Sequence, residues 1–115
     1  MTSSLLNQPL LVLANVPDQE LAEKIATALV EQGLAACVNI LAPVSSVYRW
    51  QGKMQREREI PLLIKTTQAR YQELERTILQ LHPYDVPEII ALPVTAGLPA
   101  YLAWMQDETA RPLRL

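Results

Sequence analysis

The chain has 115 residues, half of them hydrophobic, and a formal net charge of −2 at pH 7. This length suits one domain, 1–115. A domain this small cannot bury so much apolar surface by itself, so we expect an oligomer. The charged residues form no basic stripe, which argues against a nucleic-acid partner. The single cysteine, Cys37, forms no internal disulfide and fits a reducing compartment.

The first pattern is the apolar run Leu10–Ala14, typical of a central strand covered on both faces. The longer run 10–16 is too short for a membrane span, and no positive charge precedes it as in a signal peptide. We therefore expect a cytoplasmic protein without membrane contact. Asp18 is a good N-cap for a helix that Gly33 would end.

The segment 35–66 predicts an unusually long hairpin. Residues 35–48 are apolar and β-branched, and Pro43 should bend or bulge this strand. A tight turn at 50–53, with Gly52 at positive φ, leads to a second strand over 54–66. Pro61 predicts a bulge or an unpaired edge there. Such a hairpin would project from the domain and pair with another chain.

The remainder predicts a helix capped by Thr67 and ended by His82-Pro83, a strand over 88–94 and a helix over 99–106. Residues 1–8 and 110–115 are expected to be loose termini. The order βαββαβ with an added C-terminal helix is that of an α+β, ferredoxin-like antiparallel sheet with both helices on one face.

Several short motifs occur together along the chain. They are Pro17-Asp18, Gly33–Asn39, Tyr48–Lys53, Glu57-x-Glu59, Ile64-Lys65-Thr66, His82–Glu88 and Tyr101–Trp104. In this order and spacing they resemble the CutA divalent-cation tolerance family over Leu10–Trp104. The resemblance implies a non-enzymatic homotrimer, similar to PII signalling proteins, that pairs through the 35–66 hairpin. It also implies a role in the tolerance of, or response to, copper and other divalent metal ions.

Three residues are candidate metal ligands. Glu57 and Glu59 lie two apart on a strand, so their carboxylates share a face roughly 7 Å apart and could hold a divalent cation. The alternative is a solvated strand face. His82, the only histidine, is either a ligand or a partner of a carbonyl at the helix end.

The family resemblance also limits this metal site. Ala14 stands where the family has a cysteine ligand, and Leu81 precedes His82. Without a thiolate we expect any Cu(II) or other divalent cation to bind weakly, and no cofactor to be required. Cys37, among apolar neighbours, is expected to be a buried core residue.

A second set, Lys65, Tyr84, Glu88 and Trp50, is expected to line a cleft between subunits. A structural ion pair between Lys65 and Glu88 explains two of these residues equally well, and Trp50 at the hairpin tip suggests a subunit contact. The leading hypothesis is a trimeric metal-response protein. The alternative is a PII-like sensor or scaffold that binds a small metabolite or anion in the cleft. The three glycines of the chain form no phosphate-binding loop, which argues against a nucleotide as this ligand.

Overall fold

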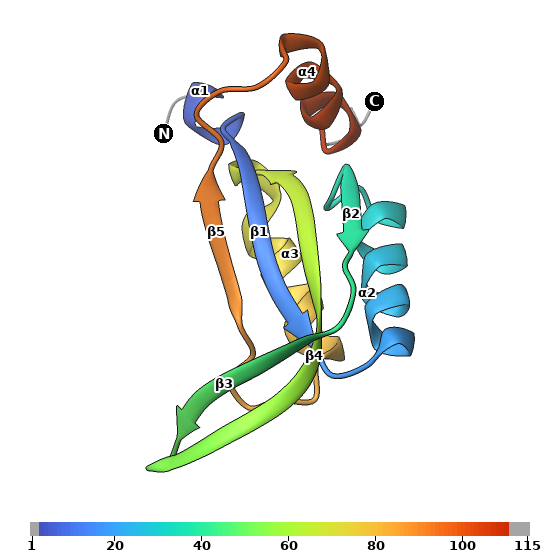
Figure 1. Ribbon diagram of the computed structural model, residues 1–115. Coiled ribbons are helices and arrows are strands. Elements are labelled where there is room, and N and C mark those ends of the chain that lie inside the picture. The colour runs from blue at the N-terminus through green and yellow to red at the C-terminus, as the bar shows by residue number, and fades with distance from the viewer. Residues whose placement is uncertain (1–2, 111–115) are drawn as a thin grey trace.

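The computed structural model describes residues 3–110, and their secondary structure follows the predicted order (Figure 1). The elements are α1 (Ser3–Leu6), β1 (Pro9–Val16), α2 (Gln19–Glu31), β2 (Cys37–Ile40), β3 (Val44–Trp50), β4 (Lys53–Thr67), α3 (Gln68–Leu81), β5 (Ile89–Pro93) and α4 (Pro99–Glu108). The strands form an antiparallel sheet in the order β2-β4-β1-β5, with β3 also paired to β4. Helices α2 and α3 cover one face (Figure 1). The ferredoxin-like prediction is therefore confirmed.

The core lies between the sheet and these two helices. Alternate residues of β1 and β4 are buried against α2 and α3, as the two-residue period of a strand requires. They are Val12, Ala14, Val16, Ile60, Leu62 and Ile64, and they meet Ile25, Leu29, Leu74 and Ile78 from the helices. β1 is central, as predicted, but within one chain only its helix-facing side is fully covered.

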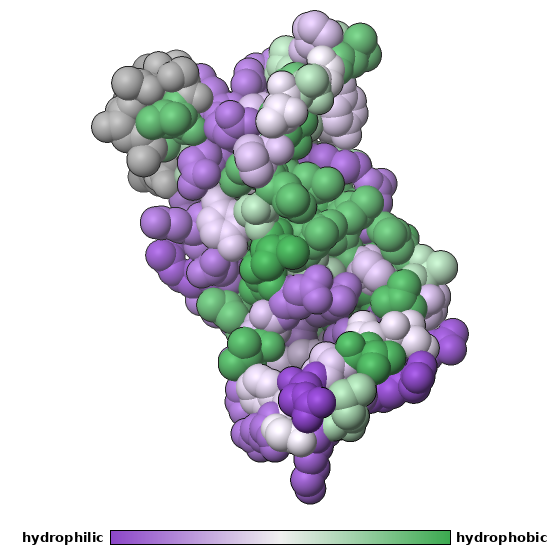
Figure 2. All heavy atoms as spheres, turned by 60° about the vertical axis from the view of Figure 1, so that its left-hand side comes forward, coloured by the Kyte–Doolittle hydropathy of each residue, from purple (hydrophilic) through white to green (hydrophobic). Residues whose placement is uncertain are grey.

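The opposite side of the sheet is apolar, and within residues 3–110 no helix covers its middle (Figure 1). We call it the open face, and it carries Leu11, Leu13, Pro61, Leu63, Ile90 and Leu92. Ile90 and Leu92 are 52% and 45% exposed. Figure 2 shows hydrophobic side chains gathered in one broad area over the middle of the molecule. A surface of this kind on a small domain is typical of a contact with another chain.

Both ends of α2 have the predicted signals. Asp18 Oδ1 accepts a hydrogen bond from the Leu21 N–H at 2.8 Å, which caps the first turn. At the other end Gly33 takes φ +68°. The N–H of Leu34 bonds to the Leu29 carbonyl at 2.9 Å, and that of Gly33 to the Val30 carbonyl at 3.1 Å. These two bonds form a Schellman motif, which requires a left-handed residue at Gly33.

The long hairpin exists, but its first strand is divided. Residues 41–43 interrupt the expected 35–48 strand, so that β2 and β3 pair separately with the 15-residue β4. Of the two alternatives predicted at Pro61, the bulge is wrong, because the β1–β4 register runs through it unbroken. The unpaired edge is confirmed, because Pro61 lies between the β2–β4 and β3–β4 ladders and belongs to neither. The Pro61 carbonyl accepts the Leu41 N–H at 3.0 Å. In an antiparallel strand the N–H and C=O of one residue point toward the same neighbouring strand. The N–H that Pro61 lacks would therefore point toward residues 41–43, where the first strand of the hairpin is interrupted.

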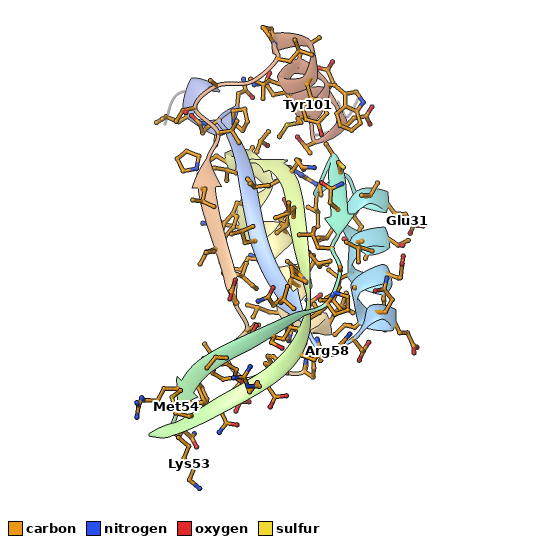
Figure 3. The ribbon with its side chains drawn as sticks, in the orientation of Figure 1. Glu31, Lys53, Met54, Arg58 and Tyr101 are labelled. Atoms are coloured by element: carbon orange, nitrogen blue, oxygen red, sulfur yellow. The ribbon has the colours of Figure 1, made fainter. Side chains whose placement is uncertain are left out.

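The hairpin tip projects from the body of the domain (Figure 1). Gln51 and Gly52 both have positive φ, 50° and 80°, which makes a type I′ turn. Lys53 and Met54 point into solvent there (Figure 3). The projection gives the molecule extents of 50 × 28 × 26 Å.

The remaining differences concern the chain ends and α3. Residues 1–2 and 111–115 lie outside the described residues, but 3–6 form α1, which the sequence did not predict. The Gln8 side chain donates to the carbonyls of Pro9 and Val94 at 2.9 and 3.0 Å. Helix α4 extends two residues beyond its expected end. Thr67 precedes α3 as predicted, but its side chain makes no capping hydrogen bond.

Candidate cation-binding cleft

A cleft of about 840 Å³ lies between the projecting hairpin and the loop that joins α3 to β5. The hairpin contributes residues from both of its strands, and the loop contributes most of the His82–Glu88 motif. The lining residues are Ser46, Val47, Tyr48, Trp50, Glu57, Glu59, Pro83, Tyr84, Asp85, Val86, Pro87 and Glu88. Two motifs far apart in the sequence therefore meet because β4 leads from the hairpin into the sheet that also holds β5.

The cleft is acidic. Four carboxylates line it, those of Glu57, Glu59, Asp85 and Glu88, and none of its described lining residues is basic. Glu59 is only 7% exposed, and no hydrogen bond or ion pair joins it to another described residue. Its carboxylate oxygens face the cleft and are not themselves cut off from it, so whatever occupies the cleft is what solvates them. A cation in the cleft would find this carboxylate with no competing protein donor among the described residues.

Two tyrosines share the cleft with these carboxylates. Partial burial, together with the negative charges of Glu57 and Glu59, raises the pKa of Tyr48. Burial and the nearby Glu59 also raise the pKa of Tyr84. Both hydroxyls thus stay protonated at neutral pH and add neutral oxygen atoms to the lining.

His82 is held next to the cleft but does not line it. It is buried, and its Nε2 lies 2.7 Å from the Asn15 carbonyl. The Tyr84 N–H donates to Nδ1 at 3.2 Å, so Nε2 is the nitrogen that carries the proton and donates to Asn15. The imidazole also packs against the Tyr84 ring at 4.7 Å between centroids. His82 therefore ties the loop to the end of β1, and the carbonyl it binds belongs to the strand, not to the helix end.

The predicted cleft set is only partly brought together. Trp50, Tyr84 and Glu88 line the cleft. Lys65 does not; its Nζ donates to Asn39 Oδ1 and lies 3.8 Å from Cys37 Sγ. The alternative ion pair between Lys65 and Glu88 is wrong, since Glu88 accepts from the Asn15 amide at 3.3 Å. Asp85 was missed, although it lies inside the His82–Glu88 motif.

The expectation for Cys37 is also wrong. Its side chain is half-buried and shares the outer side of the sheet with Lys65, its partner in the β2–β4 register. The neighbouring Val38 packs against the core instead. Both residues are half-buried, and one position in the strand decides which of them packs against the core.

Comparisons with known proteins agree with this fold and its motifs. A family model described as CutA1 divalent ion tolerance protein matches residues 10–108. The divalent-cation tolerance protein CutA of Thermus thermophilus is 49% identical over 98 residues, which are 85% of this chain and 95% of that protein. The solved structure of that Thermus protein aligns with a TM-score of 0.87 at 47% identity, covering 89% of this chain and 99% of the other.

Two further relatives differ in length or location. The chloroplastic CutA of Arabidopsis thaliana is 44% identical over 87% of this chain, which spans only 55% of the plant protein. A structure described as the periplasmic divalent cation tolerance protein CutA of Archaeoglobus fulgidus has a TM-score of 0.85 at 34% identity, covering 88% of this chain and 98% of that one. Relatives thus occupy different compartments, and the cytoplasmic location stays a prediction. No helix among residues 3–110 has the length and apolar character needed to cross a membrane.

Fold and comparisons together define the class of protein: a ferredoxin-like, PII-like domain with a projecting hairpin. The chain belongs to the CutA1 divalent ion tolerance protein family. This is a family of divalent-cation tolerance proteins rather than enzymes, in agreement with the prediction from the sequence.

Proposed function

We propose that this chain acts in the response to divalent metal ions as a homotrimer that binds such ions weakly in the acidic cleft. The observation that carries the proposal is Glu59, which is buried in the cleft without a hydrogen bond or ion pair to any residue that the structure describes. Glu57 lies two residues away on the same strand and lines the same space. Their carboxylate oxygens are ligands that divalent cations accept.

The ligand set explains why the binding should be weak. Among the described residues, no three His, Cys, Asp or Glu side chains come close enough together to hold a metal ion. Ala14 occupies the position where the family resemblance would place a cysteine ligand. Both ring nitrogens of His82 already have hydrogen-bond partners. Water, or a ligand from a neighbouring chain, would complete the shell. Among divalent ions of the first transition row, Cu(II) should bind such a site most tightly.

The trimer is supported by the open face and the hairpin. The open face exposes leucine and isoleucine side chains that solvent does not favour. The hairpin edges beyond the sheet leave backbone groups available for pairing with another chain. Trp50, at the hairpin tip and 42% exposed, would then be covered by a neighbouring subunit.

A second candidate function, a PII-like metabolite sensor, is supported by the aromatic lining. Trp50, Tyr48 and Tyr84 stand beside the four carboxylates. This combination suits a small organic cation, through cation–π contacts and charge, and opposes an anion. A metabolite bound in this cleft would therefore be a cation and not an anion.

Isothermal titration with Cu(II), Zn(II) and a small amine tests these functions. We expect the substitution Glu59→Gln to weaken metal binding by about tenfold, since it removes one charged ligand and keeps its size. Glu31→Gln is the matched control, because Glu31 lies on α2, away from the hairpin (Figure 3). Identical isotherms for the wild type and Glu59→Gln would end the proposed metal site. Heat released by the amine but not by metals would favour the sensor.

A further inference from the structure

The projecting hairpin has two faces of opposite charge. Along β4, two arginines alternate with two glutamates, in the order Arg56, Glu57, Arg58 and Glu59. Successive side chains of a strand point to opposite faces, so the arginines lie on the face away from the cleft that the glutamates line. The sequence therefore contains no basic run here, although the folded hairpin has a basic face.

β3 adds a third arginine to this basic face. Arg49 stands between Tyr48 and Trp50, which both line the cleft, so its side chain points to the other side of the hairpin. Its partner in the β3–β4 register is Met54, which is 64% exposed. Arginine and methionine are both enriched in protein interfaces. We call the four residues of this side the arginine face: Arg49, Met54, Arg56 and Arg58.

The arginine face has no acidic partner in its own chain. All three arginines are exposed, and no ion pair joins any of them to another residue within 3–110. Arg56 and Arg58 lie two apart on the same side of β4, where their like charges repel each other. Because the hairpin projects from the body of the domain (Figure 1), an acidic surface that neutralises these charges would belong to another molecule.

The acidic cleft is the complementary surface. None of its described lining residues is basic, and Glu59 has no hydrogen bond or ion pair to any described residue. Tyr48, Trp50 and Tyr84 add aromatic rings, on which a guanidinium group stacks well. The arginines of the same hairpin point away from this cleft, so they do not fill it in their own chain.

We infer that the arginine face of one chain docks in the acidic cleft of a neighbouring copy. The inference rests on the homotrimer of the proposed function and names the two surfaces that meet in it. A contact between two different patches of one chain is heterologous, and three copies around a threefold axis close it into a ring. Three positive charges then meet four carboxylates, which is favourable charge complementarity.

The docked arginines would also regulate the metal site of the proposed function. A guanidinium and a divalent cation are attracted by the same carboxylates, so each weakens the binding of the other. Isothermal titration should therefore show Arg56→Gln/Arg58→Gln binding Cu(II) roughly fivefold more tightly than the wild type. Equal affinities would overturn this competition. Failure of both proteins to bind Cu(II) would instead refute the proposed metal site.

Charge reversal followed by sedimentation velocity tests the docking itself. Arg56→Glu/Arg58→Glu should raise the concentration at which half of the chains are trimeric by roughly tenfold or more. Glu57→Arg/Asp85→Arg, on the cleft side, should do the same. All four positions are exposed in the single chain. The chain that combines both pairs of substitutions should form a more stable trimer than either pair alone, because its charges are again opposite.

The matched control is Lys24→Glu/Arg76→Glu, which changes the net charge equally at exposed positions of α2 and α3. Arg56→Glu/Arg58→Glu trimers as stable as this control would overturn the docking and assign the arginine face to a different acidic partner. A combined variant no more stable than its two parents would overturn it equally. If Glu57→Arg/Asp85→Arg does not fold, Glu57→Gln/Asp85→Asn replaces it. A monomeric wild type would refute the homotrimer of the proposed function.

Discussion

The open face provides the sharpest test of the proposed trimer through the substitution Leu92→Glu. Full burial of a leucine or isoleucine contributes about 1.5–3 kcal/mol. Leu92 and Ile90 still expose 45% and 52% of their surface. Covering what remains of both would contribute about 1.5–3 kcal/mol per chain, or about 4–9 kcal/mol in a trimer. These two positions alone can thus supply much of the stability of an assembly that persists at micromolar concentration.

Leu92→Glu removes about half of that contribution and adds a carboxylate to each buried interface. Each uncompensated charge costs several kcal/mol, so the trimer should lose more than about 10 kcal/mol and dissociate. Leu79→Glu is the control, since Leu79 is 48% exposed on α3, on the other side of the sheet. Sedimentation velocity at several concentrations measures both. Wild-type monomers at micromolar concentration, or a Leu92→Glu trimer as stable as the control, would refute the reasoning.

Two further predictions concern stability within one chain. Burial and the hydrogen bond to Glu75 raise the pKa of Tyr71 from 10.0 to about 12. Tyr71 ionises at a lower pH in the unfolded chain than in the folded one. The contribution of its protonated hydroxyl to the free energy of unfolding is therefore complete below pH 10 and lost by about pH 12. In urea unfolding, the free energy of unfolding of the wild type should exceed that of Tyr71→Phe by less at pH 11.5 than at pH 9. A difference that is the same at both pH values would contradict this. Gly33→Ala should cost about 1–2 kcal/mol because φ is +68° there. The new Cβ meets only an ordinary contact, 3.7 Å from the Glu108 carbonyl oxygen, so a neutral result in the same assay would contradict the strain argument.

The sequence by itself determined the elements and their order, because their signals are local. Asp18 and Gly33 set the ends of α2 through bonds that span only a few residues. The turn at Gln51-Gly52 follows from the need for positive φ. These features, with the hydrophobic periods, were sufficient for the βαββαβ order and for the resemblance to the family.

Only the tertiary structure decided which side chains meet and which face the solvent. Cys37 and Val38 are adjacent apolar residues, and the β2–β4 register alone turns the cysteine outward. The pairing of Lys65 with Asn39, and not with Glu88, depends on the strand order in the same way. The buried Arg70 gave no signal in the sequence, because a charged residue in the first turn of a helix is ordinarily solvated. Burial arises from contacts between distant segments, and local sequence preferences do not encode it.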